Sequence, residues 1–342
     1  MKKKRVLHLL VSNSYSGAEN VVCSIIENNL DYDMFYCSLD GPIRDILNKK
    51  KISFVPLSRI SIREVRKVIK DYQIDIIHAH DFQASVLAVL SGFKGKIISH
   101  IHCNPSFIKT WNFYSFFYSM VSKKFSSIVF VSEQCLGGTV FLEKIKDKVV
   151  VIHNVVDAKR IEQLSCERDA ISSDLVFLGR MVDLKQPQLV IEITNLLKMK
   201  MPDIQTIMIG DGKLLDECKN LVNQYQLENN VKFLGFQENP FSYVKNSKVA
   251  VMPSKYEGLG MSAIECMTLG IPVLNSGQGG LLEIFRHHFD FICNSKEEYV
   301  QKVMDLFTDV SLYRKYQRDC QKIVKDFVDV DSFIQKINQL YK

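Results

Sequence analysis

The chain has 342 residues, enough for one very large domain or two of ordinary size. Its hydrophobic fraction of 46% and charged fraction of 24% are those of an ordinary soluble globular protein, and no apolar run reaches the roughly 18 residues of a transmembrane helix. Nine scattered cysteines without a C-x-x-C pair argue against a zinc site or a disulfide framework and favour a reducing cytosol.

Positive charge is concentrated in the first half of the chain. Residues 1–155 contain 21 Lys and Arg against 13 Asp and Glu, a net charge of +8, and the remainder carries −2 of the total of +6. A basic surface favours an anionic partner such as a membrane, a phosphorylated acceptor or a nucleic acid. Lysines and arginines also serve as plain solvated surface, and that alternative stays open.

The first residues predict a strand, a glycine-containing loop and a helix. Residues 6–11 are apolar and follow a basic run, but His8 interrupts them and they are too short for a signal peptide, so we expect a buried strand. A polar loop over 12–16 leads to Gly17, which opens a helix. This order is typical of a Rossmann-like unit, although the full G-x-G-x-x-G fingerprint is absent.

Strands and helices then alternate along the first half. This alternation predicts a parallel sheet, in which ligands gather at the carboxyl ends of the strands. We expect further strands at 34–39, 54–57, 74–80, 96–102, 127–133 and 149–152, and helices at 62–71 and 84–90.

Two expected strands end in an H-x-H pair. These are His78 with His80 and His100 with His102, and strand alternation places both members of each pair on one face. The pairs fit a metal site, but the pattern does not obviously supply a carboxylate or cysteine ligand to complete it. A hydrogen-bonding or acid–base histidine is the favoured interpretation, and ordinary packing is the third.

Residues 107–121 are rich in aromatic side chains and are followed by Lys123 and Lys124. An amphipathic aromatic helix with basic flanks is typical of a membrane interface. An aromatic core helix is the slightly favoured interpretation, and docking at a membrane stays open.

The second half repeats the α/β plan after an exit at residues 153–157 and a polar, patternless linker at 158–173. Strands are expected at 175–179, 206–209, 231–236 and 249–252. Arg180 and Lys185 follow the first of these and precede a helix that starts near Pro187. A guanidinium and an ammonium at the end of a strand form a clamp for phosphate, unless they are only solvated loop charges.

Residues 254–276 predict a loop, a helix and a strand after an apolar segment, and they carry Glu257 and Glu265. Two glycines between the carboxylates let the backbone approach an anion at the helix N-terminus. The carboxylates themselves suit the hydroxyls of a sugar or a ribose. Alternatively, Ser262 is the N-cap and Glu265 completes a capping box. Beyond this stretch we expect an anion-binding turn at 277–280, helix over 296–325 and a last helix from Asp331.

The motifs of both halves occur in a recognisable order. Phe177-Leu-Gly-Arg180 with Lys185, Ile209-Gly-Asp-Gly212, Val231-x-Phe-Leu-Gly235 and the pair Glu257/Glu265 resemble the retaining nucleotide-sugar glycosyltransferases of family 4 (glycosyl transferases group 1), which have the GT-B fold. Ser16-Gly-Ala-Glu19, the strand ending in His102 and Asn154-x-x-Asp157 match more loosely. The exit motif departs from the family, which usually has Pro-Asn-Gly where this chain has His153-Asn154-Val155.

The resemblance implies two Rossmann-like parallel-sheet domains facing across a cleft. Residues 1–157 would form the acceptor-side domain, 158–173 a linker and 174–325 the domain that binds the nucleotide sugar. Residues 326–342 would form a C-terminal helix that packs back on the first domain.

The resemblance also implies roles for individual residues. Arg180 and Lys185 would hold the diphosphate, Glu265 the ribose and Glu257 the donor hexose, with His102 beside the reacting sugar. The catalytic set would be His102, Glu257, Arg180 and Lys185. The donor-binding set would be Gly17, Arg180, Lys185, Gly210, Phe236, Glu257, Leu259, Gly260 and Glu265.

We therefore expect a cytoplasmic hexosyltransferase that moves a sugar from a nucleoside-diphosphate sugar, above all a UDP-sugar. The inner face of the membrane is a location compatible with this expectation. The acceptor would be a glycan or a lipid-linked glycan of capsule or exopolysaccharide biosynthesis. No cofactor and no nucleic-acid partner are expected. No metal is expected either: Asp31/Asp33 and Asp329/Asp331 have the D-x-D spacing of metal-dependent glycosyltransferases, but they lie at turn or helix-start positions, where Asp is common. A nucleotide-sugar epimerase or hydrolase of the same fold and a non-catalytic nucleotide-sugar-binding partner are the alternatives.

Overall fold

A computed structural model of the chain describes residues 2–103, 105–167 and 171–342. The chain forms two compact units, the first from Met1–Val155 with Val330–Lys342 and the second from Val156–Asp329. Each unit is built on a parallel sheet with helices between the strands, so the predicted α/β class is confirmed.

The first unit contains a seven-stranded sheet of order β3-β2-β1-β4-β5-β6-β7, with every described pairing parallel. Its central strands are buried on both faces, so apolar residues do not alternate with exposed polar ones along them. The strands are β1 Arg5–Leu9, β2 Asp33–Leu39, β3 Phe54–Leu57, β4 Ile76–His80, β5 Lys96–Ile101, β6 Ser127–Phe130 and β7 Val149–Val151.

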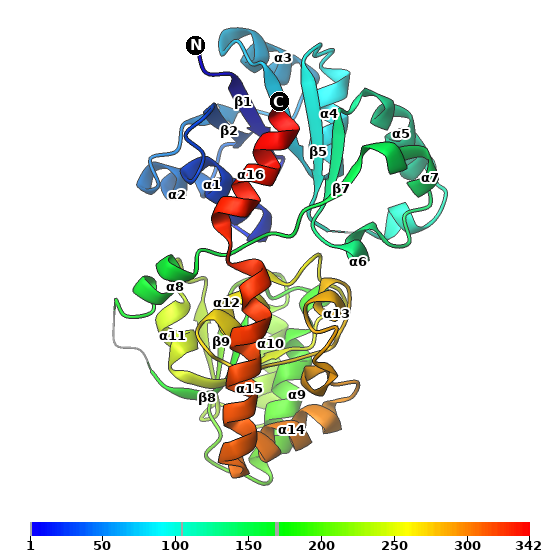
Figure 1. Cartoon of the computed structure of the whole chain (residues 1–342). Helices are drawn as coiled ribbons and strands as arrows, with labels where there is room; N and C mark the ends of the chain where they lie inside the picture. Colours follow the sequence, from blue (N-terminus) through cyan, green and yellow to red (C-terminus); the bar gives the residue numbers. More distant parts are fainter. Residues whose placement is uncertain (1, 104, 168–170) are drawn as a thin grey trace. The chain divides into compact units, whose positions relative to one another are not determined.

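Helices connect these strands, and the last helix of the chain returns to them. Phe333, Ile334, Ile337 and Tyr341 of that helix, α16, are buried with Val21 and Ile25 of α1 and with residues of the sheet, and Figure 1 shows α16 lying along this unit. The helices of the unit are α1 Gly17–Glu27, α2 Ile43–Lys49, α3 Ile62–Asp71, α4 Asp81–Leu90, α5 Phe113–Val121, α6 Glu133–Leu136, α7 Leu142–Ile145 and α16 Val330–Tyr341, with 3-10 turns at Ser106–Lys109, Ser122–Lys124 and Lys146–Lys148.

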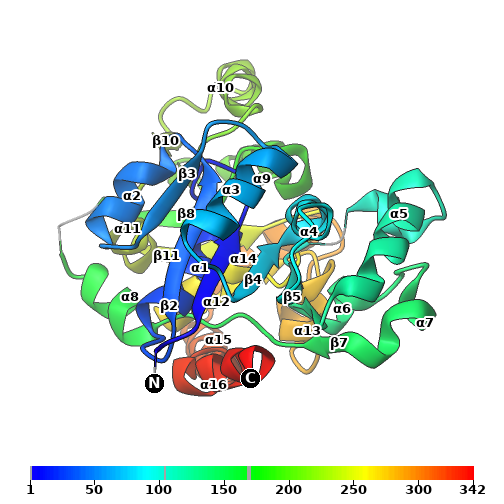
Figure 2. The same cartoon turned by 90° about the horizontal axis from the view of Figure 1, so that it is seen from above.

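The structure adds helix α2 to the elements expected from sequence and starts α4 three residues earlier than the expected residue 84. Helices α5, α6 and α7 gather beside the β6–β7 edge of the sheet (Figure 2). Among the described residues, no helix has the length and apolar character needed to cross a membrane.

The second unit contains a five-stranded parallel sheet of order β10-β9-β8-β11-β12. Its strands are β8 Ser173–Leu178, β9 Thr206–Ile209, β10 Val231–Gly235, β11 Ser247–Met252 and β12 Val273–Asn275. Its helices are α8 Ala158–Leu164, α9 Pro187–Lys198, α10 Leu215–Gln224, α11 Phe241–Lys245, α12 Met261–Thr268, α13 Gly280–Ile284, α14 Lys296–Thr308 and α15 Val310–Ile323, with 3-10 turns at Asp183–Lys185, Phe289–Phe291 and Val324–Phe327.

Two expectations for this unit need correction. The stretch 158–173 is not patternless, because it begins with α8, which Asp157 caps through a hydrogen bond from the Arg160 amide and which packs against α11 and α12; residues 168–170 of the expected linker lie outside the described residues. The helical stretch 296–325 is two helices, because Asp309 leaves the helical conformation and caps the N-terminus of α15.

Candidate functional site

The second unit places the Glu257 carboxylate in a buried polar cluster. Lys185 Nζ lies 2.5 Å from each carboxylate oxygen, and Ser254 Oγ donates a hydrogen bond to Oε1 at 2.7 Å. Glu257 is only 6% exposed, and a charge buried to this degree needs such partners. Lys185 follows β8 and Glu257 follows β11, and these two strands are neighbours in the sheet.

Two glycines fix the backbone of Glu257. Gly279 forms an isolated parallel bridge with Glu257, and the Gly280 amide donates to the Glu257 carbonyl at 2.9 Å. Gly279 has a φ of +63°, and a Cβ on Gly280 would meet the backbone of Gly258 and Leu259. The sequence predicted an anion-binding turn in this segment and missed its function in holding the Glu257 loop.

The N-cap of α12 is Gly260, with a φ of +106°, and not Ser262 as predicted. Because the helix has no side-chain cap, the capping-box interpretation of Glu265 is wrong. Burial raises the pKa of Glu265 to about 7, and the nearby positive charge of Lys185 opposes the rise. The side chain of Leu259 is buried, so only its backbone is available to a ligand.

Arg180, Gly210 and Phe236 lie just after the carboxyl ends of β8, β9 and β10. The Arg180 side chain is exposed and, within the described part of the chain, has no ion-pair partner. Gly210 has a φ of +133°, and a Cβ there would collide with the carbonyl of Gly179. Phe236 is 53% exposed. The predicted donor-binding residues of this unit therefore follow the carboxyl ends of its parallel strands.

Gly17 is the first residue of α1 in the first unit. A Cβ built on it would meet nothing within 4 Å, so the space beside the residue is open. The N-cap Ser16 donates from its hydroxyl to Glu19 at 2.5 Å, and the Glu19 side chain is almost completely buried. The start of α1 therefore combines open space at Gly17 with a buried carboxylate at Glu19.

The histidines at the strand ends lie together, and they are joined by a fifth, His8 of β1. His8 Nδ1 lies 3.0 Å from His80 Nε2, and His80 Nδ1 lies 2.9 Å from His102 Nε2. The sequence analysis passed over His8 as an interruption of a strand. His8 joins the other histidines because β1 is an interior strand next to β4, and His8 pairs with His78 in register.

The remaining histidines form a second hydrogen-bonded series. His78 Nε2 lies 3.2 Å from His100 Nδ1, and His78 Nδ1 lies 2.7 Å from the hydroxyl oxygen of Tyr341 at the end of α16. Burial lowers the pKa of all five rings, to about 3 for His8 and about 4 for His102, so the rings are neutral at pH 7.

Asp81 supports His102 and was also missed by the sequence analysis. Its carboxylate accepts the His102 backbone amide at 2.9 Å, and burial raises its pKa to about 6. The residue has a φ of +66°, a strained conformation for a non-glycine residue.

Two triads of these histidines have ligand atoms within 4.8 Å of one another and are the described residues closest to a metal-binding set. They are His8, His78 and His80, and His80, His100 and His102. The orientation of their rings, given below, decides what they do.

The aromatic segment is not the core helix that was expected. Tyr118 of α5 is buried, but Trp111, Phe113, Tyr114, Phe116 and Met120 are between 52% and 75% exposed. Lys144 lies over the Trp111 ring at 4.6 Å, and Lys109, Lys123 and Lys124 are exposed nearby in sequence. We call these five exposed side chains the α5 aromatic surface.

Two family models match the chain. The model described as glycosyl transferases group 1 matches residues 168–341, which include the Lys185–Glu257 site. The model described as glycosyltransferase family 4 matches residues 21–160.

Similar proteins have been assigned glycosyl-transfer activities. An uncharacterized glycosyltransferase of Methanocaldococcus jannaschii is 28% identical over 62% of this chain, and the match spans 58% of its own length. The UDP-Gal:alpha-D-GlcNAc-diphosphoundecaprenol alpha-1,3-galactosyltransferase of Escherichia coli is 22% identical over 99% of this chain and 97% of its own.

A solved structure shares the fold. The Anabaena protein Alr3699/HepE in complex with UDP and glucose superimposes with a TM-score of 0.83 at 18% identity, over 98% of each chain. Together with the two parallel sheets, this likeness confirms the GT-B fold.

Proposed function

The chain belongs to the family of glycosyl transferases group 1, and we propose that it is a retaining hexosyltransferase that uses a nucleoside-diphosphate sugar, in first place a UDP-sugar. The acceptor in this proposal is a glycan or a lipid-linked glycan of cell-surface polysaccharide biosynthesis. The observation that carries the proposal is the buried Lys185–Glu257 pair, with Glu265 in the helix α12 that follows Glu257 in the chain.

The reaction leaves a nucleoside diphosphate with new negative charge. Lys185 and Arg180 supply two positive charges at the carboxyl ends of the strands, and the N-terminus of α12 supplies free backbone amides at Leu259 and Gly260. In this scheme these groups stabilise the leaving diphosphate without a divalent ion or a cofactor.

The two carboxylates recognise hydroxyl groups in this proposal. Glu257 accepts hydrogen bonds from the hexose, and the donor diphosphate offers Lys185 a second anionic partner. Glu265 accepts from the ribose hydroxyls and must be ionised to accept at both oxygens. Phe236, exposed after β10, offers a face to the nucleotide.

The residues of the first unit complete the assignment. In this proposal the open space at Gly17 allows close approach of a diphosphate, and His102 lies beside the reacting sugar. The Escherichia coli relative is named for a diphosphoundecaprenol-linked substrate. By analogy, with the α5 aromatic surface and the net charge of +8 over residues 1–155 as support, we propose a lipid-linked acceptor met at the anionic inner face of the membrane.

A donor panel tests the function. The purified chain is incubated with UDP-glucose, UDP-galactose, UDP-N-acetylglucosamine and GDP-mannose, with and without polyprenyl-diphosphate sugar acceptors and with and without a metal chelator. Acceptor-dependent release of nucleoside diphosphate, with a glycosylated lipid in the mass spectrum, is the expected result. Conversion or hydrolysis of the donor without acceptor would assign an epimerase or hydrolase, and binding without turnover would assign a non-catalytic partner.

A further inference from the structure

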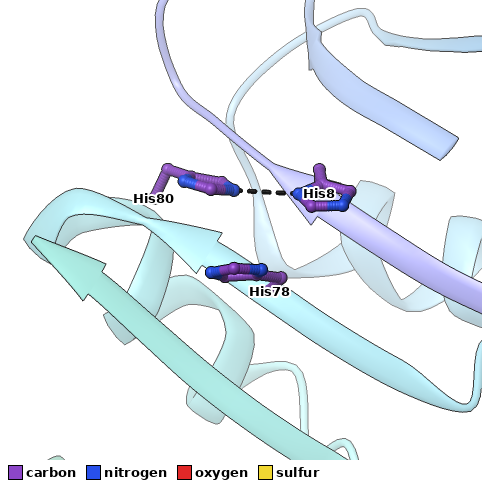
Figure 3. Close-up of side chains that lie close together, drawn as sticks. All are labelled: His8, His78 and His80. Carbon is purple, nitrogen blue, oxygen red and sulfur yellow. Dashed lines mark hydrogen bonds between the residues drawn. The ribbon is translucent and has the colours of Figure 1, made fainter. Parts of the chain in front are cut away.

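The planes of the five buried histidine rings are nearly parallel. The angles between neighbouring rings range from 13° to 35°. In Figure 3, His8 and His80 meet edge to edge, and His78 lies beneath them with its ring in a separate layer. Nitrogen lone pairs lie in the ring plane, so three rings divided between two layers cannot point at one ion unless they turn. The arrangement favours hydrogen bonding within each layer over a three-histidine metal centre.

Each layer is a hydrogen-bonded row. The first row runs His8, His80, His102, and the second runs Tyr341, His78, His100. The rows stack on each other, with ring centroids 4.5 Å apart for His78 and His80 and 4.3 Å apart for His100 and His102.

Neutral rings restrict how protons can be distributed along a row. A neutral imidazole carries one N–H and one lone pair, so every contact between two rings needs one of each. If His8 donates from Nδ1 to His80, then His80 must donate from Nδ1 to His102, and His102 carries its proton on Nδ1. If the direction is reversed, all three rings carry the proton on Nε2. Any mixed arrangement sets two lone pairs or two N–H groups against each other in a buried site.

The same rule applies to the second row. When Tyr341 donates its hydroxyl proton to His78 Nδ1, both His78 and His100 carry their protons on Nε2. When the direction is reversed, both carry them on Nδ1, and the Tyr341 oxygen accepts. Each row therefore has two allowed states and no stable intermediate.

The ends of the first row lack partners of their own. His102 Nδ1 and His8 Nε2 are buried polar atoms without a hydrogen-bond partner among the described residues. The state of the row therefore decides whether His102 Nδ1 carries the proton or the lone pair.

We infer that His8 and His80 are positioning residues for His102, and that the three rings switch tautomer as one unit, so that His8 and His80 set which nitrogen of His102 carries the proton. The use of this switch rests on the proposed role of His102 in glycosyl transfer. The switch itself does not, because a tautomer is measured without any transfer reaction.

Nitrogen NMR of the full chain labelled with ¹⁵N-histidine tests the inference. Long-range proton–nitrogen correlations distinguish Nδ1–H from Nε2–H rings. We expect His8, His80 and His102 to share one tautomer and His78 and His100 to share one. The exposed His287 ring of the second unit, which belongs to neither row, is the internal reference. Neighbouring rings of opposite tautomer within one row of the wild-type protein would overturn the inference.

Two substitutions test the coupling. His80→Gln interrupts the row, and His8→Asn preserves a hydrogen bond to His80 while its amide can either donate or accept. In both variants the tautomer ratio of His102 should shift about tenfold toward a mixture, as expected when one buried hydrogen bond no longer sets the preference. His78→Gln, in the other row, is the matched control and should leave His102 unchanged. If His80→Gln does not fold, His8→Asn decides. An unchanged His102 in a folded His8→Asn protein rejects the coupling.

Discussion

Lys185 Nζ lies 2.5 Å from both carboxylate oxygens of Glu257, with 19% of the lysine side chain and 7% of the glutamate side chain exposed. The pair is therefore a structural contact as well as a candidate part of the donor site. Replacing one partner leaves the other buried and unpaired, so activity and stability must be measured separately.

Replacing either cation of the donor site should reduce turnover. For Arg180→Ala and Lys185→Ala we expect kcat/KM to fall about 100-fold, because a positive charge that stabilises the leaving diphosphate is lost. Arg180→Ala should keep the wild-type Tm, since its side chain is exposed. Near wild-type kinetics of the folded protein in either variant would remove that residue from the site.

Lys185→Ala should also lower the free energy of unfolding, by roughly 3 kcal/mol, because the Glu257 carboxylate is left buried without its partner. The double variant Lys185→Met/Glu257→Gln, which has no charge in this position, should recover most of that loss while staying inactive. Urea denaturation of the single and double variants provides the measurement. Equal instability of both would show that packing, and not the unpaired charge, is responsible.

Glu265 should make stability depend on pH near neutrality. Its folded-state pKa of about 7 lies above the ordinary value of 4.5, so the folded protein holds this proton more tightly than the unfolded chain does. The stabilising contribution is complete below the ordinary value and is lost as the pH rises through the folded value. Glu265→Gln should therefore be more stable than wild type at about pH 8, and the difference should shrink toward about pH 5. Exposed Glu297→Gln is the control for thermal melts at both pH values.

The same carboxyl group should control nucleotide binding. Because an ionised carboxylate is the better acceptor for ribose hydroxyls, the affinity of the wild-type chain for UDP should rise as the pH passes through about 7. Glu265→Gln should bind UDP about tenfold more weakly at higher pH and without this dependence. Calorimetric titration at several pH values measures both. Unchanged UDP affinity in the variant would exclude the ribose contact.

Periodicity predicted the two parallel sheets because buried strands leave a strong local signal. The spacing of Glu257 and Glu265 also singled out the loop and helix after β11. The ion pair to Lys185 could not be read in this way, because it depends on β8 and β11 becoming neighbours across 72 residues of sequence. The helix cap was misassigned for a related reason: Gly260 and Ser262 are both acceptable caps locally, and the backbone contacts of Gly280 lie outside that window.

The histidines show the same limit. Their positions at the strand ends were predictable, but the pairing of β1 with β4, which brings His8 to the others, is a property of the strand order. The aromatic helix α5 was predicted to be core because its composition is apolar. The helix buries Tyr118 and Val121, while four of its large side chains and Trp111 just before it are exposed.

The hydroxyl of Tyr341 should anchor α16 to the first unit. It is completely buried and lies 2.7 Å from His78 Nδ1. Tyr341→Phe should lower the free energy of unfolding by about 1–2 kcal/mol, because the ring stays packed while the His78 nitrogen loses its partner. Tyr114→Phe, at a site where the side chain is 67% exposed, is the matched control and should have no effect. If the two variants unfold at the same urea concentration, the Tyr341–His78 hydrogen bond does not contribute to stability.

The α5 aromatic surface should bind anionic membranes reversibly. Trp111 and Phe116 are 52% and 53% exposed, and each lysine near an anionic surface adds on the order of 1 kcal/mol of attraction that salt weakens. In vesicle sedimentation we expect binding to anionic vesicles, little binding to neutral ones and release as the ionic strength rises.

Substitution separates insertion of the rings from attraction of charge. Trp111→Ser with Phe116→Ser should reduce binding to anionic vesicles at low salt, whereas Phe289→Ser, an exposed aromatic of the second unit at 64% exposure, should not. A response only to lysine replacement would mean that the surface is held by charge and that the rings do not insert. If the wild-type chain ignores anionic vesicles even at low salt, the membrane-bound acceptor is excluded and a soluble glycan acceptor takes its place.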